Sequence, residues 1–350
     1  MYAMRPSTAR PAARPARAKL RDYPDFLRLL VLSWLVVFVV VMATSAVSAN
    51  PRFWKLNWPD TDFSQTSVDF GSIMSGGPPK DGIPLIDNPE FVPLAKYKDA
   101  AETEPVITFA HKGDARAYPL RVLIWHEIVN DTVGGLPVSV TYCPLCNSSI
   151  VFDRRLDDKI LDFGTTGKLR NSDMVMYDRQ TETWWQQFTG TGIVGELNGK
   201  ALKMLPARVE SLAKFRARYP AGKVLVPSDP NFRPYGNNPY MGYDTSRRPF
   251  LYRGDMPKGI PPLAYVVKVG KQAWSLEKLK KAGTIVSGDL TLTWTKGQNS
   301  ALDMQEIADG RDIGSVVVRR KTFQGSRDEV HDVTFAFVFH AFVEGGTIHK

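Results

Sequence analysis

The sequence predicts an α+β fold, rich in β structure, built from two related strand–helix–strand halves behind one N-terminal transmembrane or signal helix. Three observations support this prediction: short apolar segments that alternate like strands, a weak internal similarity, and an uncharged stretch near the N-terminus. The chain has 350 residues, of which 43% are hydrophobic and 23% are charged. This composition is ordinary for a packed globular protein with a sizeable core.

The positive charge is concentrated at the N-terminus. The net charge is +9, from 45 Lys and Arg against 36 Asp and Glu. Residues 1–28 carry six Arg and one Lys against two Asp, a charge of +5, which leaves +4 for the other residues. More than half of the excess therefore belongs to a basic, cytoplasmic tail. The remaining charge gives no support to nucleic-acid binding.

Residues 29–49 are uncharged and predict a membrane anchor or a signal segment. A helix of this length can cross a bilayer, and the preceding positive charge favours an N-terminus in the cytoplasm. Val47 and Ala49 also fit a signal-peptidase site with cleavage before Asn50. The sequence thus predicts a single-pass inner-membrane protein with its ectodomain in the periplasm or outside, or alternatively a secreted or periplasmic form. The membrane is the partner that this segment implies.

The exported part is predicted to begin with an irregular linker or wrap at residues 50–94, which is rich in Pro, Gly, Asn and Asp. A first half follows at 95–255 and a second half at 256–350. In the first half the predicted elements are strands at 106–110, 115–118, 137–142, 149–152 and 174–177 and a helix at 119–133. A long ordered loop is predicted at 227–262, and the aromatic residues 333–343 predict a last strand.

The two halves contain similar segments in the same order. Residues 113–123 resemble 270–279, and 135–142 resemble 288–294. Each pair follows the order turn, short strand, helix, glycine and alternating strand, which predicts a diverged repeat. Chance similarity is the alternative. Two cysteines follow the strand of the first copy, whereas Thr295 occupies that place in the second.

Cys143 and Cys146 form the sharpest chemical motif, Cys-Pro-Leu-Cys. Two thiols at this spacing can close a disulfide, bind a soft metal or exchange disulfides. The Tyr-Cys-Pro-x-Cys order is similar to glutaredoxin sites, which need a helix after the motif to lower the pKa of the first thiol. Here the β-branched segment that ends at Phe152 follows instead, which favours a strand. A structural disulfide is the simplest alternative, because an exported protein meets oxidising conditions.

A metal site needs further ligands, and His126, on the predicted helix, is the first candidate. Together with Cys143 and Cys146 it would make a site for copper or zinc. Weaker candidate ligands are His111, Met174 and Met176.

Polar residues near the motif supply further candidates. Glu127 and Asp131 lie four residues apart on the predicted helix and, with the two cysteines, are the candidate catalytic groups. A solvated helix face is the alternative interpretation. The remaining polar and aromatic candidates form a predicted polar pocket: Asn130, Asn147, Asp173, Asp178, Arg179, Trp184 and Trp185.

Three ordered motifs resemble an uncharacterised bacterial family, the domain of unknown function number thirty-one seventy-nine. They are WHEIVND at residues 125–131, TYCPLCNS at 141–148, and RNSD at 170–173 with YDRQTE at 177–182. The resemblance implies a periplasmic or surface protein and supplies no activity. It implies these site residues: His126, Glu127, Asn130, Asp131, Cys143, Cys146, Asn147, Asp173, Asp178 and Arg179. The chain departs from the family near its end, where FAFVFHAF, with His340, stands in place of a Trp-rich strand.

The leading hypothesis is an exported, membrane-anchored protein with a Cys143, Cys146 and His126 site for a transition metal, copper before zinc, in metal handling or redox chemistry. A thiol–disulfide oxidoreductase is the first alternative. A non-catalytic scaffold for an envelope protein complex, with a structural disulfide, is the second.

Overall fold

The computed structural model describes residues 51–350, and they form a β-rich fold. Strands account for 40% of the described residues and helices for 15%, and the larger sheets are arranged as a five-bladed β-propeller, so the predicted α+β class is wrong. No helix among residues 51–350 is long and apolar enough to span a bilayer. The predicted membrane or signal segment, 29–49, lies outside the described residues. The domain boundaries at residues 95 and 256 stay predictions.

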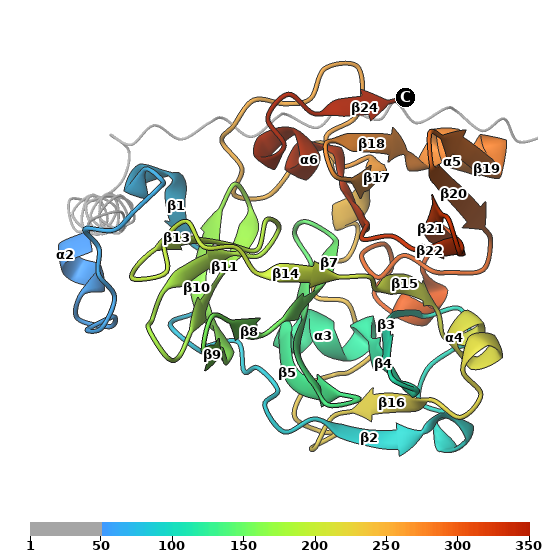
Figure 1. Cartoon of the computed structure of the whole chain (residues 1–350), viewed down its shortest axis with the longest axis horizontal. Helices are drawn as coiled ribbons and strands as arrows, with labels where there is room; N and C mark the ends of the chain where they lie inside the picture. Colours follow the sequence, from blue (N-terminus) through green and yellow to red (C-terminus); the bar gives the residue numbers. More distant parts are fainter. Residues whose placement is uncertain (1–50) are drawn as a thin grey trace, which may run out of the picture. The chain divides into compact units, whose positions relative to one another are not determined.

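Three of the five sheets are built mainly from strands that follow one another along the chain (Figure 1). Alternating and β-branched sequences explain their extended conformation. Sheet A contains β1 (Ile73–Ser75), β10 (Phe163–Arg170), β11 (Asp173–Asp178), β12 (Trp184–Gln186) and β13 (Thr191–Val194). Sheet B contains β5 (Ile128–Val133), β6 (Leu136–Cys143), β7 (Ser148–Asp153) and β14 (Lys203–Leu205). Sheet G contains β19 (Thr284–Ser287), β20 (Leu290–Thr295), β21 (Ser315–Thr322) and β22 (Gly325–Asp328).

The other two sheets share a less local arrangement, in which a helix carries the chain across the sheet to a strand that pairs in parallel with a strand of the central hairpin. Sheet C has the order β15 (Arg208–Ser211), β3 (Pro105–His111), β4 (Asp114–Pro119), β16 (Lys223–Val226) and β2 (Glu90–Pro93). Sheet F has the order β23 (Asp332–Phe335), β17 (Tyr265–Val269), β18 (Gln272–Ser275) and β24 (Thr347–His349). α4 (Leu212–Arg218) joins β15 to β16, and α6 (Ala336–Phe342) joins β23 to β24. These helix crossovers are departures from a simple meandering blade.

A seven-residue helix also follows the central hairpin of each of these sheets and leads to the next sheet. α3 (Leu120–His126) connects sheet C to sheet B, and α5 (Leu276–Ala282) connects sheet F to sheet G. Pro119 precedes α3, where a missing N–H costs no helical hydrogen bond. Ser275 caps α5 by accepting a hydrogen bond from the Lys278 N–H.

Two predicted elements are wrong: the helix at 119–133 and the last strand at 333–343. The helix predicted at 119–133 ends at His126, because Glu127 has φ +58° and its N–H donates back to the Leu123 carbonyl. The β-branched residues that follow form β5 instead. The last strand predicted at 333–343 is divided between β23 and α6, since the chain turns at Phe335 into a helix whose apolar face is buried.

Short elements complete the fold. The early segment contains α2 (Pro51–Trp54), η2 (Phe70–Ser72) and η3 (Leu94–Lys96), and its strands β1 and β2 pair with β10 and β16. The remaining short elements are the hairpin of β8 (Arg155–Leu156) and β9 (Lys159–Ile160), and the 3-10 helices η4 (Tyr243–Thr245) and η5 (Ile307–Asp309).

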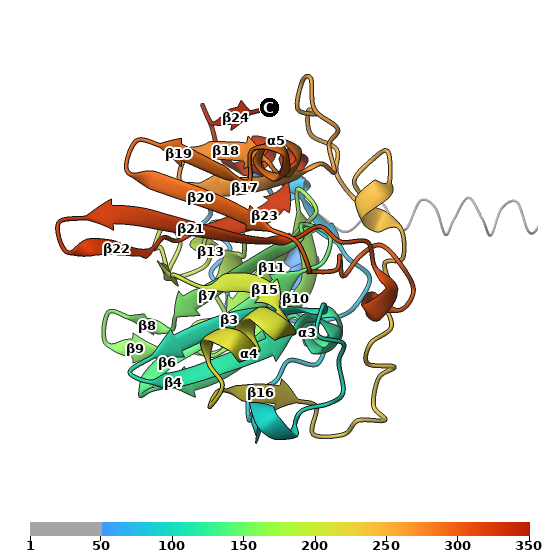
Figure 2. The same cartoon turned by 90° about the vertical axis from the view of Figure 1, so that its right-hand side faces the viewer.

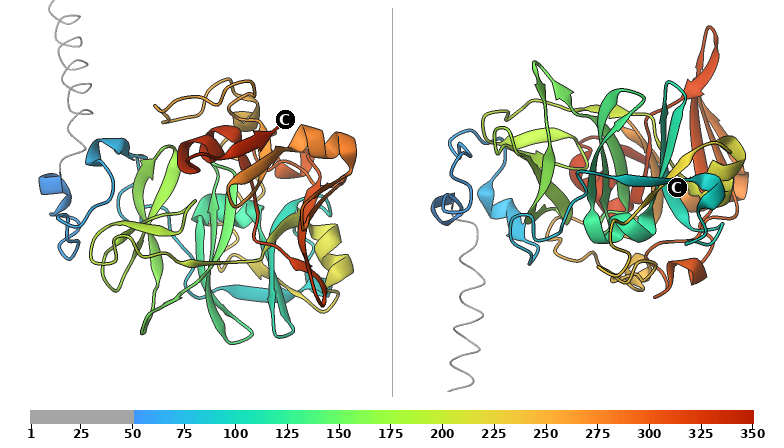
Figure 3. Two further views of the ribbon diagram at one scale, coloured as in Figure 1. Left: turned by 45° about the horizontal axis from the view of Figure 1, so that its top comes forward. Right: turned by 90° about the horizontal axis from the view of Figure 1, so that it is seen from below.

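The sheets share one large hydrophobic core, with buried residues from all five of them. Figure 2 shows the orange and red strands of sheets F and G on one side of the green and teal strands of sheets B and C. β14 and β15 follow each other along the chain and carry it from sheet B to sheet C (Figure 1). Figure 3 shows the loop between β16 and β17 as a long gold segment, as the sequence predicted for 227–262.

Candidate metal centre

Cys143 and Cys146 lie on a tight turn between two buried strands of sheet B. Cys143 is the last residue of β6, and β7 begins at Ser148. The Cys146 N–H donates to the Cys143 carbonyl at 3.2 Å. Both thiols are free, and the two residues are 2% and 0% exposed. The predicted strand before the motif is confirmed, and the motif lies inside the protein rather than at an open rim.

The turn that carries the two cysteines is hydrogen-bonded to β23, a strand of sheet F. The Cys146 carbonyl accepts hydrogen bonds from Thr334 Oγ1 at 2.7 Å and from the Phe335 N–H at 3.3 Å. Asn147 has φ +48°, and its side-chain amide donates to the Val333 carbonyl at 2.8 Å. β23 therefore fixes the position of the cysteine turn.

Asp173 supplies the third candidate ligand. One sulfur or oxygen atom from each of Cys143, Cys146 and Asp173 lies within 4.8 Å of the others, and all three residues are buried. Asp173 begins β11, directly after Asn171 and Ser172, which both have positive φ. This turn presents the Ser172 carbonyl to both thiols, at 3.9 Å from Cys143 Sγ and 3.6 Å from Cys146 Sγ.

The Asp173 carboxyl is only half satisfied by the protein. Its Oδ2 accepts hydrogen bonds from Gln186 Nε2 at 2.6 Å and from the Phe188 N–H at 2.9 Å. Its Oδ1 is buried and has no hydrogen-bond partner among the described residues. Burial raises the pKa of Asp173 to about 6, although the Phe188 N–H, Gln186 and the Cys146 thiol lower it. A buried oxygen without a partner is costly, and a cation would satisfy it.

Electrostatics keep the thiols protonated in the absence of an ion. Burial raises the pKa of Cys143, and it raises the pKa of Cys146 further, with contributions from Cys143 and Asp173. The chain forms no helix directly after Cys146, so no helix N-terminus lowers the pKa of either thiol. These thiols are therefore poor nucleophiles as they stand, whereas a bound cation would deprotonate them.

Glu127 is a further buried acid, whose charge interacts with Asp173 and Cys143. Glu127 is 8% exposed, and its carboxyl makes no hydrogen bond or ion pair among residues 51–350. Burial, with a smaller contribution from Asp173, raises its pKa to about 8. The same carboxyl contributes to the raised pKa of Cys143. Its positive φ, unusual for a residue with a side chain, is the kind of strain that clusters at functional sites.

The loop between β16 and β17 covers the cysteine turn. The Tyr243 hydroxyl donates to the Leu145 carbonyl at 3.1 Å and accepts from the Phe250 N–H at 3.2 Å. The Phe250 carbonyl accepts from Ser172 Oγ at 2.6 Å. Tyr240 is half-buried, and burial, with smaller contributions from Glu127 and Cys143, raises its pKa. The tyrosines therefore separate the centre from water.

The two histidines predicted as ligands do not belong to the group of Cys143, Cys146 and Asp173. The His126 ring faces Pro84 and Tyr235: Nδ1 is 2.5 Å from the Pro84 carbonyl oxygen, and Nε2 is 2.7 Å from the Tyr235 hydroxyl. Burial lowers the pKa of His126. His111 ends β3 and lines a surface pocket that does not include the cysteines. Met174 and Met176 lie on β11 and belong to the same hydrophobic core as the two cysteines.

Asp131 and Asn130 have structural partners rather than a place in the cluster. The Asp131 carboxylate accepts hydrogen bonds from Arg116 Nη1 at 2.6 and 2.7 Å and from the Tyr118 hydroxyl at 2.5 Å. Glu127 and Asp131 do not share a helix face, since Asp131 lies on β5. Asn130 donates to Phe163 O at 2.8 Å and so connects sheets B and A.

The remaining candidates are also dispersed. Asp178 accepts hydrogen bonds from Thr181 and from Trp185 Nε1, which lies 2.8 Å away. Arg179 pairs with Asp87 at 2.7 Å on the surface. Trp184 belongs to a separate aromatic cluster with Trp54, Trp58 and Tyr177. Of the predicted polar pocket, the structure brings only Asp173 into the ligand cluster, while Asn147 supports the cysteine turn.

Three features of the candidate centre were not predicted from the sequence. They are Asp173 as a candidate ligand, the cover formed by Tyr240 and Tyr243, and the hydrogen bonds from β23 that support the cysteine turn. The usable signal was the Asn-Ser-Asp order, because Asn tolerates a positive φ and so favours a tight turn before Asp173. The cover and β23 are distant along the chain and leave no local pattern.

Comparison with known proteins agrees with the resemblance of the three motifs. No curated protein and no solved structure matches the chain significantly. A family model described as "Protein of unknown function (DUF3179)" matches residues 80–346, which include the whole candidate centre and most of the described fold. The chain therefore belongs to the DUF3179 family.

Proposed function

We propose that this protein is an exported, membrane-anchored protein whose Cys143, Cys146 and Asp173 side chains bind one transition-metal ion. The observation that carries the proposal is the group of three buried ligand atoms within 4.8 Å of one another. Asp173 Oδ1 supports it, since this buried oxygen accepts no hydrogen bond of normal geometry among the described residues. The uncharged segment 29–49 supports the anchor, as the sequence alone suggested.

The donor set changes the preferred metal. With the His126 imidazole as the expected third ligand, the sequence alone favours copper over zinc. A carboxylate is a hard donor that suits Zn²⁺ and suits Cu⁺ poorly, whereas two thiolates suit both ions. We therefore place zinc first and copper(I) second. Three protein ligands leave a tetrahedral ion one open position, as in zinc sites that bind a further molecule.

Glu127 extends this proposal as a neighbouring proton carrier. Two thiolates and one carboxylate already exceed the charge of Zn²⁺ by one, so an additional buried negative charge is unfavourable. Glu127 therefore stays protonated near the ion, which agrees with its raised pKa. A protonated carboxyl can donate a hydrogen bond to whatever occupies the open position.

The thiol–disulfide alternative receives less support. Exchange requires a thiolate that a second disulfide can reach. Here both sulfurs are buried under the loop that carries Tyr243, and their pKa values are raised. A purely structural disulfide would leave the Asp173 oxygen unexplained.

Metal analysis of the full-length protein tests the proposal. The protein is purified under reducing conditions, stripped with a chelator, and offered Zn²⁺ or Cu⁺ before mass-spectrometric metal analysis. We expect about one ion per chain for the wild type and essentially none for the C143S/C146S double variant. D173N should weaken binding, whereas D178N, which neutralises another buried aspartate, should retain the ion. A wild-type protein that stays metal-free under metal-replete, reducing conditions contradicts the proposal.

A further inference from the structure

A second site lies on the surface between sheets B, C and G. This pocket, here called the basic pocket, has a volume of about 490 Å³. Its lining comes from the β3–β4 turn, the ends of β7 and β14, β15, α4 and β22. It shares no residue with the cysteine centre. A cavity of this size accommodates a small molecule rather than a polymer.

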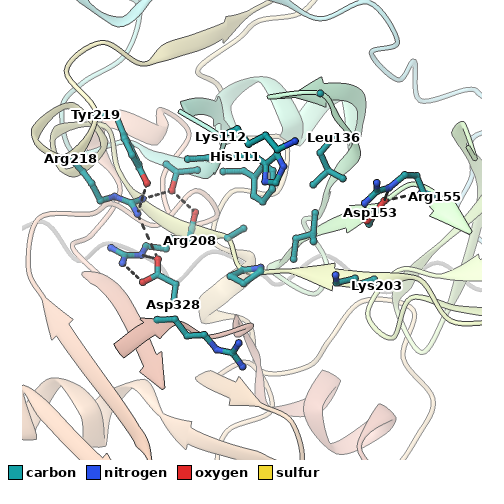
Figure 4. Close-up of a pocket in the computed structure, with 18 residues that line it drawn as sticks. His111, Lys112, Leu136, Asp153, Arg155, Lys203, Arg208, Arg218, Tyr219 and Asp328 are labelled. Carbon is teal, nitrogen blue, oxygen red and sulfur yellow. Dashed lines mark hydrogen bonds and ion pairs between the residues drawn. The ribbon is translucent and has the colours of Figure 1, made fainter. Parts of the chain in front are cut away.

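Cationic side chains surround the pocket on several sides. Figure 4 shows Arg208 and Arg218 together at one side of the pocket and Arg155 and Lys203 at the other. Lys112 stands between them on the β3–β4 turn, and Arg327 of β22 also lines the pocket.

Three carboxylates neutralise only half of these six cations. Asp328 accepts from Arg208 Nη2 at 2.6 Å and Nε at 2.8 Å, and Asp153 accepts from Arg155 Nη2 at 2.7 Å. Glu210 forms an ion pair with Arg218 from behind the pocket. The excess of three positive charges corresponds to Lys112, Lys203 and Arg327. Such an excess in a concave surface attracts anions.

The arrangement is also rigid and partly apolar. Arg208 is fixed by two hydrogen bonds to Asp328, which join sheet C to the edge of sheet G. Arg218 is fixed by Thr108, 2.8 Å away, and by Glu210. Guanidinium groups held in this way lose little entropy when they bind an anion. Leu136 and Leu205 contribute apolar surface that a bare inorganic ion would not use.

By contrast, the side chains of Lys112 and Arg327 make no hydrogen bond or ion pair with any residue from 51 to 350. Their charges are therefore available to a ligand. From these observations we propose that the basic pocket binds a small organic anion that carries two or more carboxylate or phosphate groups. Its carbon skeleton would lie against the leucines, and its charged groups would reach the two sides of the pocket.

Calorimetric titration of the full-length protein with citrate and with pyrophosphate tests the proposal. Citrate represents the carboxylate source and pyrophosphate the phosphate source. We expect saturable binding of at least one probe, weakened roughly tenfold or more in the K112A/R327A variant. The matched control, R247A/K271A, removes the same two charges from exposed positions outside the pocket and should bind like the wild type.

Each outcome decides the proposal. Binding of citrate alone or pyrophosphate alone supports the site and assigns its preferred charged group. Equal affinity in wild type and K112A/R327A overturns it, because the bound anion then lies elsewhere. Absence of saturable binding for both probes up to about 10 mM overturns it as well. Thermal melts of both variants show whether the fold is retained, and the proposal requires the affinity loss in a variant that melts like the wild type.

Discussion

Two units of the chain have the same order of elements and nearly the same local geometry, yet only one carries the candidate centre. The cysteine unit comprises β4, α3, β5 and β6, and the threonine unit comprises β18, α5, β19 and β20. Each has a strand that leads directly into a seven-residue helix, followed by a two-stranded antiparallel pair. The second strand of that pair ends at Cys143 in one unit and at Thr295 in the other.

The residue after the helix shows what distinguishes the units. Glu127 has φ +58° and ψ −36°, and Gly283 has φ +69° and ψ −47°. In both, the carbonyl accepts a hydrogen bond of 2.8 Å, from the N–H of Tyr142 or Trp294. Glycine adopts this conformation without strain, whereas glutamate does not. The cysteine unit thus retains a strained, buried acid where the backbone calls for glycine, which supports a functional role for Glu127.

The largest expected effect is on metal binding. In the cysteine unit, C146S removes a proposed ligand and should weaken zinc binding roughly 100-fold or more. T295S, a change at the corresponding turn of the threonine unit, should leave the affinity unchanged. Competition with a chromogenic chelator measures both. If both variants bind zinc like the wild type, the metal centre is not in the cysteine unit.

The second prediction concerns the contact between the cysteine turn and sheet F. The Asp332 carboxylate accepts hydrogen bonds from Ser148 Oγ at 2.6 Å and from the Ser149 N–H at 3.0 Å, and burial raises the pKa of Asp332 to about 6. The folded protein therefore holds this proton more tightly than the unfolded chain. Its contribution to stability is complete below about pH 4 and is lost as the pH rises through about 6, roughly 3 kcal/mol in total.

Denaturant unfolding of the metal-free protein between pH 4 and 7 measures this slope. D332N removes the titration while retaining the side-chain size, so its stability should fall less with rising pH than that of the wild type. Parallel slopes in the two proteins contradict the assignment of the proton to Asp332.

The comparison of the two units also shows which features of the fold and of the candidate centre could be predicted from the sequence. Short apolar segments rich in β-branched residues predicted β3, β6 and β7 because strand propensity is local, and these strands are buried along almost their whole length. The Cys-Pro-Leu-Cys spacing likewise located the centre. His126 lies outside the group of Cys143, Cys146 and Asp173, and its two ring nitrogens contact the Pro84 carbonyl and the Tyr235 hydroxyl, which come from segments distant along the chain. Asp173 and the tyrosine cover come from sheet A and a long loop, and their approach to the cysteines depends on long-range packing.

The propeller arrangement was missed for a similar reason. β2 pairs with β16, and β24 pairs with β18, so the edges of sheets C and F are completed by distant segments. No local pattern records such pairings. The sequence segments that form the short helices α3 and α5 have local helix signals. These signals favoured an α+β class over an all-β class.

A third prediction exchanges the residues that distinguish the units. E127G relieves the strained conformation and removes a buried carboxyl, so it should raise the free energy of unfolding of the metal-free protein by about 2 kcal/mol. G283A introduces strain at the corresponding position, where an added Cβ would contact nothing within 4 Å, and should lower that free energy by about 1 kcal/mol. Urea titration of both variants checks the opposite signs. A destabilised E127G would show that the glutamate serves the fold rather than the site.

The smallest expected effect concerns how the two helices begin. The threonine unit starts α5 with Ser275, whose Oγ accepts a hydrogen bond from the Lys278 N–H at 3.2 Å, whereas Pro119 precedes α3 with no side-chain cap. S275A should therefore destabilise the protein by about 1 kcal/mol. Ser211 precedes α4 without a capping hydrogen bond, so S211A serves as the control and should cost less. Equal losses in the two variants, measured by urea unfolding, would mean that burial rather than capping accounts for the effect at Ser275. A larger loss for S275A would show that α5 depends on a side-chain cap, which α3 lacks.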